Sequence, residues 1–471
     1  MRELVRQNLR FFLFSTLAAL ALRTLFNFRF PAITSDSFVY GDIAKNWLQH
    51  GIYGLSGIAD ITPTYIRLPG YPAFLAAVFA IFGMEHYRAV LVLQMFVDLG
   101  TCLLIADMAH RLVSPRAAKA AFLLSALCPF LANYAAAALT ETWEVFFTVL
   151  ALDLALVGLA ELHVPCFRSW LGCGLAVGAA ILLRPDGGLL LLTVGVYLGA
   201  RMIRDLARQP RAGVPALHAV HLLRAGLIVL AAAITPLVPW TLRNLRTFHE
   251  FQPLSPRYAN EPNTFVPMGF NRWVKTWMAN YASVEEIYWM VPGNPVDIDL
   301  LPDRAFNSPE QRDVTEQLLD DYNQALRVTP ALDARFAALA ADRIHRAPLR
   351  YYLWLPLLRV ADMWLRPRTE IMPCSTRWWE FDEERKWLMV GVVFGIVNLL
   401  YMGAALLGLV RGRFAAHLGL LMTFVILRSA FLGTLENPEP RYTLECYPVV
   451  IVLVAALFQR FPASSTLDSR S

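Results

Sequence analysis

Residues 35–54 read SDSFVYGDIAKNWLQHGIYG, and they follow the apolar run MRELVRQNLRFFLFSTLAALALRTLFNFRF at residues 1–30. The run is long enough to cross a hydrocarbon core, which takes about 20 residues. The second stretch is too polar to cross, but Val39, Ile43 and Trp47 recur every four residues with polar side chains on the other sides. The sequence therefore predicts a membrane helix followed by an amphipathic helix in the membrane plane.

The composition of the whole chain is that of a polytopic membrane protein. Of the 471 residues, 56% are hydrophobic and 17% are charged, and the mean hydropathy is +0.45. A soluble domain has about one quarter charged residues. The net charge of +5 comes from short basic clusters between apolar runs. Such clusters are typical of cytoplasmic loops, so we expect no nucleic-acid partner.

The apolar runs and basic clusters together predict the topology. Beyond the first helix, we expect spans at about 88–110, 117–135, 142–160, 170–184, 187–201, 223–240, 387–410, 414–434 and 446–460. The basic stretches 111–119, 201–224 and 411–413 belong in the cytoplasm. All three basic stretches can lie in the cytoplasm only if the short apolar segment 70–85 does not cross the membrane and is an interfacial or re-entrant helix. The prediction is an all-α protein of about ten transmembrane helices with both termini in the cytoplasm.

This topology divides the chain into three parts. Residues 1–240 form a transmembrane module that includes the first external loop, 31–87. Residues 241–386 form an external region, helical in its second half and irregular over the Pro- and Asn-rich 252–310. Residues 387–471 hold the C-terminal transmembrane helices and a short tail.

Ionisable and aromatic residues gather where the predicted spans reach the outer face. They lie in the first external helix, in YIRLPGYP, AALTETWEV and LLRPDGG, and in TLENPEPRYTLECYP. The residues are Asp36, Arg67, Glu141, Arg184, Asp186, Glu436, Glu439, Arg441 and Tyr442. A transporter would concentrate such groups near the bilayer midplane. Their position at one face instead predicts a catalytic cavity at the membrane surface, fed laterally by a lipid.

Structural roles are also open to these residues. Asp36 can cap the external helix, and Glu141 can cap the helix that starts beside it. Asp42, on the polar side of the external helix, suits a solvated position.

The basic residues have structural alternatives too. Arg67 and Arg184 can extend to phospholipid headgroups. Glu439 and Arg441, two residues apart, can pair with each other. Inside the predicted span 88–110, Asp98 suits a polar contact between helices.

Several stretches together resemble the GT-C superfamily of polyprenyl-phosphate-sugar-dependent glycosyltransferases. In family order they are SDSFVYGDIAKNWLQHGIYG, RLPGYPAFLAAVFAIFG, LTETWEVFFTVLAL, AILLRPDGGLLLL and PWTLRNLRTFHEFQPLSP, with PEPRYTLECYPVVIVLVAAL near the end. The resemblance covers nearly the whole chain and rests on the order and spacing of the stretches. The protein O-mannosyltransferases and the aminoarabinose transferase of lipid A are the most similar members.

The resemblance implies inverting transfer of a sugar from a polyprenyl-phosphate donor, such as an undecaprenyl-phosphate sugar, to an acceptor hydroxyl. The acceptor would be a protein, lipid A or another glycan, and the site would face the periplasm of a bacterial inner membrane. Asp36 and Glu141 take the family's acidic positions, and Arg67, Arg184 and Arg441 would bind the donor phosphate.

Other residues of these stretches are possible substrate contacts: Tyr40, Asp42, Tyr71, Asp186, Glu439 and Tyr442. The sequence departs from the family where Ser37 follows Asp36, because an acid pair is usual there. This leaves open whether Asp36 acts alone or with Glu141, and whether Asp42 is the catalytic acid. A divalent metal is not excluded, although the chain has no His cluster and scattered acids are weak support for one.

The expected chemistry suits these residue types. A carboxylate within hydrogen-bond reach can take the proton of the attacking hydroxyl, and arginines can stabilise the departing lipid phosphate. Trp273, Trp277 and Tyr281 in the external region would contact a sugar or form a packed lid. A lipid-linked saccharide flippase, with Asp98, Asp107 and Asp153 along a polar path, is the alternative function, and an envelope assembly protein with a degenerate site is another.

Overall fold

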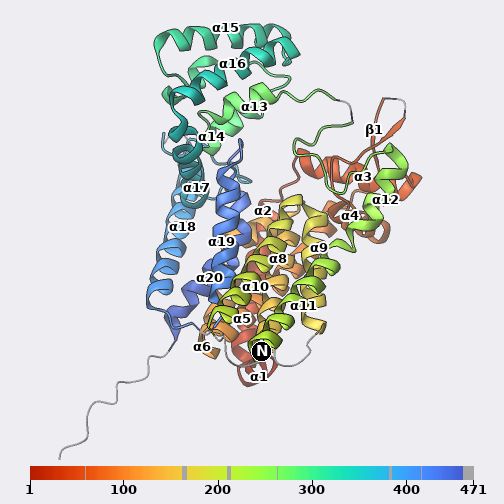
Figure 1. Cartoon of the computed structure of the whole chain (residues 1–471), viewed down its shortest axis with the longest axis vertical. Coiled ribbons are helices and arrows are strands. Elements are labelled where there is room, and N and C mark those ends of the chain that lie inside the picture. The colour runs from red at the N-terminus through yellow and green to blue at the C-terminus, as the bar shows by residue number, and fades with distance from the viewer. Residues whose placement is uncertain are drawn as a thin grey trace, which may run out of the picture.

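The structure, a computed structural model, describes residues 1–58, 60–161, 167–208, 214–262, 264–380, 384–414 and 416–459 (Figure 1). These residues are mostly helical, and the one sheet among them is a two-stranded antiparallel hairpin. The predicted all-α architecture is confirmed. The predicted C-terminal tail lies outside the described residues.

Long apolar helices form a bundle in the lower part of Figure 1. By length and composition, five described segments can cross a membrane: α2 (Leu9–Arg29), α5 (Tyr87–Leu112), α8 (Glu141–Ala160), α18 (Arg385–Arg411) and Pro440–Phe458. The last of these comprises η6 (Pro440–Cys446), α20 (Tyr447–Ala455) and η7 (Ala456–Phe458). Shorter apolar helices are α4 (Gly70–Phe82), α9 (Phe167–Leu183) and α19 (Leu418–Gly433), and α10 (Gly188–Arg208) packs between α11 (Val214–Ile234) and α19.

Two further candidate spans are bent, which brings the possible number among the described residues to seven. The bends lie between α6 (Pro115–Ala126) and α7 (Pro129–Ala135), at 52°, and between α11 and α12 (Leu237–Phe248), at 42°. Pro129 and Pro236 stand at the breaks, where a proline cannot continue the preceding helix. The spans predicted at about 117–135 and 223–240 thus coincide with bent pairs of helices, and the total of about ten spans stays a prediction.

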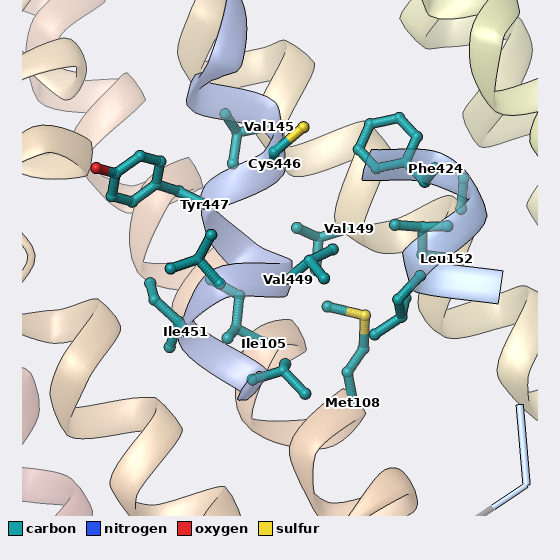
Figure 2. Close-up of a cluster of buried hydrophobic side chains, with 14 of the residues drawn as sticks. Ile105, Met108, Val145, Val149, Leu152, Phe424, Cys446, Tyr447, Val449 and Ile451 are labelled. Carbon is teal, nitrogen blue, oxygen red and sulfur yellow. The ribbon is translucent and has the colours of Figure 1, made fainter. Parts of the chain in front are cut away.

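The centre of the bundle is α20, whose nine residues are all buried. A helix that is apolar on all sides is stable only when other helices surround it. Figure 2 shows how Val449 and Ile451 of α20 meet Ile105 of α5, Val149 of α8 and their neighbours. This core holds η6, the segment immediately before α20, against the N-terminal end of α8.

The first external loop forms α3 (Ser35–His50), the hairpin of β1 (Gly54–Ser56) and β2 (Ile61–Pro63), and α4. At the start of α3, the hydroxyl of Ser37 accepts a hydrogen bond from the Thr34 N–H at 3.0 Å. The helix ends at Gly51, whose φ of 70° favours glycine. The predicted external helix is present, and its start is fixed by Thr34 and Ser37.

The external region comprises α13 (Met268–Lys275), α14 (Tyr281–Ser283), α15 (Pro309–Ala325), α16 (Pro330–Arg346) and α17 (Leu355–Leu365). Short turns complete the chain: α1 (Arg2–Gln7), η1 (Pro185–Gly187), η2 (Val284–Tyr288), η3 (Ile298–Leu300), η4 (Asp303–Ala305) and η5 (Arg350–Trp354). Trp273 and Trp277 have no exposed surface and form a core with Phe336. Of the two predicted roles for these tryptophans, the structure shows packing. In Figure 1 the external region and α3 stand at the end of the bundle opposite the N-terminus.

Candidate active site

Asp36 lies in the first turn of α3, with its carboxylate free of any capping role. The chain before it is anchored, because the Ala32 N–H donates to Ala136 and the Ala32 carbonyl accepts from Ala138, both at 2.9 Å. Since Thr34 and Ser37 cap the helix, the Asp36 carboxylate turns to Arg67, whose Nη2 is 2.8 Å away. The structural alternative of Asp36 as the helix cap is therefore wrong.

Arg441 links this pair to the membrane helices. It enters from η6, and its guanidinium lies 2.6 Å from Glu439, 3.5 Å from Glu141 and 3.8 Å from Asp36. The predicted pairing of Glu439 with Arg441 is present, and the same arginine also joins the two acids predicted to be catalytic. Three segments far apart in the sequence thus meet at one guanidinium.

Arg184, which precedes η1, is a second arginine surrounded by carboxylates, two of them from the first turn of α8. Its guanidinium lies 3.8 Å from Glu141, 3.7 Å from Glu144 and 3.4 Å from Asp186, and 4.7 Å from the centre of the Tyr442 ring. None of these contacts has the geometry of a hydrogen bond, and the Arg184 guanidinium makes none with any described residue. Like the guanidinium of Arg441, it faces carboxylates but keeps N–H groups that a substrate can bind.

Three residues that the sequence analysis missed complete the cluster. Arg428 of α19 donates to Asp186 at 3.1 Å and to Glu445, and Glu445 accepts from Thr148 at 3.2 Å. Glu144 joins through Arg184. A signal was present: Glu144 lies one turn after Glu141, and a charged residue inside an apolar helix, as Arg428 is, marks a polar partner nearby.

Charge on the cluster favours an ionised Asp36. Burial by itself raises the pKa of this carboxyl, but the guanidinium groups of Arg67 and Arg441 outweigh burial and hold the pKa below its usual value. Tyr40 lies beneath Arg67, 5.6 Å from ring centre to guanidinium, and burial raises its pKa to about 12. Tyr40 is therefore a neutral phenol.

A cavity of about 960 Å³ opens in front of the cluster, between the end of the bundle and the external region. Asp36, Glu439 and Arg441 line one wall. Another wall comes from the external region and includes Tyr281 and Trp289. Asp36 thus lies beside the arginines and lines an open cavity that is large enough for a ligand.

Other residues predicted as substrate contacts have structural roles. Tyr71 is fully buried behind Tyr40 and donates a hydrogen bond to Gln94 at 2.8 Å. Asp42 accepts hydrogen bonds from the Ser56 N–H and hydroxyl, both at 2.7 Å, and lies 3.4 Å from Lys45. Asp42 therefore holds the hairpin to α3 and contacts no member of the cluster.

The acids predicted to line a flippase path are each paired near the other end of the bundle. Asp98 forms a buried ion pair with Arg23 at 2.6 Å, the contact between helices that the sequence predicts for it. Asp107 and Asp153 lie 2.7 and 3.2 Å from Arg111. Among the described residues, no group of three or more His, Cys, Asp or Glu side chains has the geometry to hold a metal ion.

The comparisons with known proteins concern both sequence and fold. Residues 65–240 match the family described as dolichyl-phosphate-mannose-protein mannosyltransferase. No curated protein matches the chain by sequence.

Three solved structures show the extent of the likeness in fold. The apo oligosaccharyltransferase of Archaeoglobus fulgidus has a TM-score of 0.50 at 13% identity, over 95% of this chain and 50% of that chain. The same enzyme tethered to an acceptor peptide containing the NVT sequon gives 0.50 at 12%, over 95% and 49%. ArnT of Cupriavidus metallidurans bound to undecaprenyl phosphate gives 0.40 at 15%, over 95% and 77%.

The protein thus has the GT-C fold, a class of polytopic membrane protein, as its sequence predicts. Within that class, its residues 65–240 are similar to the protein mannosyltransferase family. The chain spans about half the length of the archaeal oligosaccharyltransferase that it matches. The family match includes Arg67, Glu141 and Arg184 of the cluster.

Proposed function

We propose that the protein is a membrane glycosyltransferase that moves a sugar, with inversion, from a polyprenyl-phosphate donor to an acceptor hydroxyl. The observation that carries the proposal is the placement of Asp36, Arg67, Arg184 and Arg441 in one charged cluster at the mouth of the cavity. The match of residues 65–240 to a family that is named for a dolichyl-phosphate-linked mannose supports the lipid-phosphate donor.

In this reaction the acceptor oxygen forms a bond to the anomeric carbon while the bond from that carbon to the phosphate oxygen breaks. Asp36 takes the hydroxyl proton, and the lipid phosphate leaves with the bonding electrons. Arg184, whose N–H groups have no hydrogen-bond partner among the described residues, stabilises the developing charge on the phosphate. Because inversion puts the base and the leaving phosphate on opposite faces of the sugar, the 2.8 Å contact between Asp36 and Arg67 must open when the donor binds.

The ion pair between Asp36 and Arg67 connects donor binding to proton transfer. In the free protein Arg67 and Arg441 lower the pKa of Asp36, which makes its carboxylate a weak base. An anionic phosphate that binds to Arg67 offsets this pull and raises the pKa of Asp36 towards its usual value. The base therefore becomes stronger when the donor is in place.

Glu141 takes a positioning role in this proposal. It is 3% exposed and does not line the cavity, but it contacts both Arg441 and Arg184. It therefore orients the two arginines from behind. Asp36 is the acid that reaches the reacting atoms.

The test uses vesicles that contain the purified protein and an undecaprenyl-phosphate-linked sugar, with added oligosaccharides and Ser- and Thr-containing peptides to supply the acceptor hydroxyl and release of free undecaprenyl phosphate as the readout. The lipid that co-purifies with the protein, identified by mass spectrometry, selects the sugar. Asp36→Asn is expected to lower release by at least about 100-fold, whereas Asp60→Asn, at an exposed position without a side-chain partner, is the matched control. Full release by Asp36→Asn would remove Asp36 as the base. Translocation of the sugar lipid without release would replace the transferase by a flippase.

A further inference from the structure

The external region contributes an aromatic wall to the cavity that Asp36 also lines. Trp289 is 45% exposed and lines the cavity, and its ring meets that of Tyr281 edge to face at a centroid distance of 5.7 Å. Tyr281 is fixed from behind, since its N–H donates to Asp362 at 3.0 Å and the guanidinium of Arg366 lies 5.4 Å from its ring. The wall is a rigid platform.

A carboxylate with an unused oxygen lies on the same wall. Glu370 lines the cavity, and its Oε1 accepts the Tyr134 hydroxyl at 2.8 Å. Its Oε2 is buried and has no hydrogen-bond partner. A buried acceptor without a hydrogen-bond partner is unfavourable, and more so when it is charged. A ligand that brings a hydrogen-bond donor to this oxygen would supply the missing partner.

The platform and the carboxylate belong to one local site. The charges of Glu439, Glu370 and Glu285 all act on the Tyr281 phenol, and together with burial they raise its pKa. Tyr281 is therefore a neutral hydrogen-bond donor, and its hydroxyl has no hydrogen-bond partner within the described part of the chain. Tyr281, a donor, and Glu370, an acceptor, thus both line the cavity beside an exposed aromatic ring.

We propose that this wall is the acceptor subsite and that the acceptor it binds is a saccharide, with a sugar ring on Trp289 and hydroxyl groups at Glu370 Oε2 and Tyr281. This inference rests on the proposed transferase function and names the class of its acceptor. An aromatic face suits the C–H face of a sugar ring, and a carboxylate and a phenol suit its hydroxyl groups.

The position of the wall favours the acceptor over the donor. The donor is anchored in the membrane by its lipid, and of the three arginines assigned to its phosphate, Arg67 and Arg184 are absent from the cavity lining while Arg441 belongs to it. The donor sugar therefore enters from the side of the bundle. A volume of about 960 Å³ is near the upper end of the range of about 300–1,000 Å³ for small-molecule sites, which leaves room for a second sugar beside the first.

A peptide acceptor fits the wall less well. Extended peptides are held by main-chain hydrogen bonds to a strand edge or by an apolar groove. The β1–β2 hairpin, which is the one sheet in the described residues, does not line the cavity. The cavity lining instead combines carboxylates, such as Glu285 and Glu370, with amide and phenol groups, which serve the many hydroxyl groups of a saccharide.

The experiment measures binding of a panel of lipid-free neutral and acidic oligosaccharides, and of peptides containing Ser and Thr, to the full-length protein in lipid nanodiscs. We expect at least one oligosaccharide to bind. Trp289→Ala is expected to weaken that binding more than tenfold, and Glu370→Gln about fivefold or more. Trp354→Ala and Glu316→Gln, which remove exposed side chains away from the cavity, are the matched controls.

The vesicle assay provides the second readout. Trp289→Ala and Glu370→Gln should raise the KM for the acceptor by similar factors, with the KM for the donor and the rate at saturating acceptor within about twofold of wild type. Failure of any oligosaccharide to bind, tighter binding of a peptide in a Trp289-dependent manner, or a rise in the donor KM instead would each overturn the saccharide subsite. Oligosaccharide binding without release of undecaprenyl phosphate would support the saccharide subsite but refute the proposed transferase activity.

Discussion

Arg441 is the residue on which the charged cluster depends, because Glu439, Glu141 and Asp36 all face its guanidinium. Arg441→Ala leaves three carboxylates close together without their common partner. Breaking a buried ion pair from one side costs about 3–5 kcal/mol, so we expect a clear fall in the melting temperature of the protein in nanodiscs. Arg441→Lys keeps the charge but not the forked geometry, so its melting temperature should lie between those of wild type and Arg441→Ala.

The control for Arg441 is Arg335→Ala, which removes an exposed pair with Asp321. Exposed pairs contribute about 0–1 kcal/mol, so this variant should melt close to wild type. Equal melting temperatures for Arg441→Ala and Arg335→Ala would mean that the cluster is solvated and contributes little stability.

The pH dependence of stability reports on Asp36. Its pKa is lower in the folded protein than in the unfolded chain, where it is about 3.9. The stabilisation is therefore complete above that value and is lost as pH falls through the lower folded pKa. The stability difference between wild type and Asp36→Asn, measured by thermal unfolding, should stay constant from pH 8 to pH 5 and shrink only below about pH 4. A difference that already shrinks near pH 6 would show a raised pKa.

Part of the cluster was predictable because its residues stand at helix ends in polar surroundings. Asp36, Arg67, Glu141, Arg184 and Arg441 are all visible in this way. The sequence alone gave no means to find the partner of each one, since Arg67 and Asp36 are 31 residues apart and Arg441 is 300 residues from Glu141. Pairing between distant segments depends on how the helices pack.

The residues that were missed lie in or next to apolar stretches. Arg428 falls within the predicted span 414–434 and Glu445 directly precedes the predicted span 446–460, although together with Asp186 they form a buried ionic contact. Their charges are compatible with the membrane because each pairs with the other.

At the scale of elements, α3 and the hairpin after it are joined by one side chain. Asp42 accepts two hydrogen bonds from Ser56, one from its N–H and one from its hydroxyl. Asp42→Ala removes both, each worth about 0.5–1.5 kcal/mol and more with a charged acceptor. We expect faster hydrogen exchange of residues 54–63, while the rest of α3 stays protected.

The matched control is Asp60→Ala at the exposed tip of the same hairpin. It should leave the exchange of residues 54–63 unchanged, and Asp42→Ala should retain the reaction. A loss of activity in Asp42→Ala with unchanged exchange of the hairpin would instead make Asp42 a catalytic acid, the alternative that the sequence left open.

Helix existence was more predictable than helix continuity. Apolar length identified α2, α5, α8 and α18, because any segment that crosses a bilayer must satisfy its backbone internally. It did not show that α11 stops at Ile234 and α12 begins a new direction after Pro236. The change of direction matters, since Arg243 of α12 donates to the carbonyls of Thr64 and Tyr53 and so holds the first external loop.

On the scale of the whole molecule, the two ends of the helix bundle carry different groups of charged residues. Lys119 lies 3.0 Å from Asn8, and the N-terminal amine lies 3.8 Å from Asp107, so the basic segment 111–119 adjoins the start of the chain. The charged cluster and the external region stand at the opposite end (Figure 1). This arrangement agrees with the one-sided distribution of polar residues in the sequence.

The orientation in the membrane is testable with single cysteines in a chain from which the native cysteines have been removed. By the positive-inside rule, we expect the end with the N-terminus to face the cytoplasm. An impermeant maleimide applied to intact spheroplasts should therefore label Asp313→Cys, at an exposed position of α15, but not Gln7→Cys in α1. After permeabilisation both should react, which controls for accessibility. Labelling of Gln7→Cys alone in intact spheroplasts would invert the protein, place the cavity in the cytoplasm and make the donor a lipid-linked sugar of the inner leaflet.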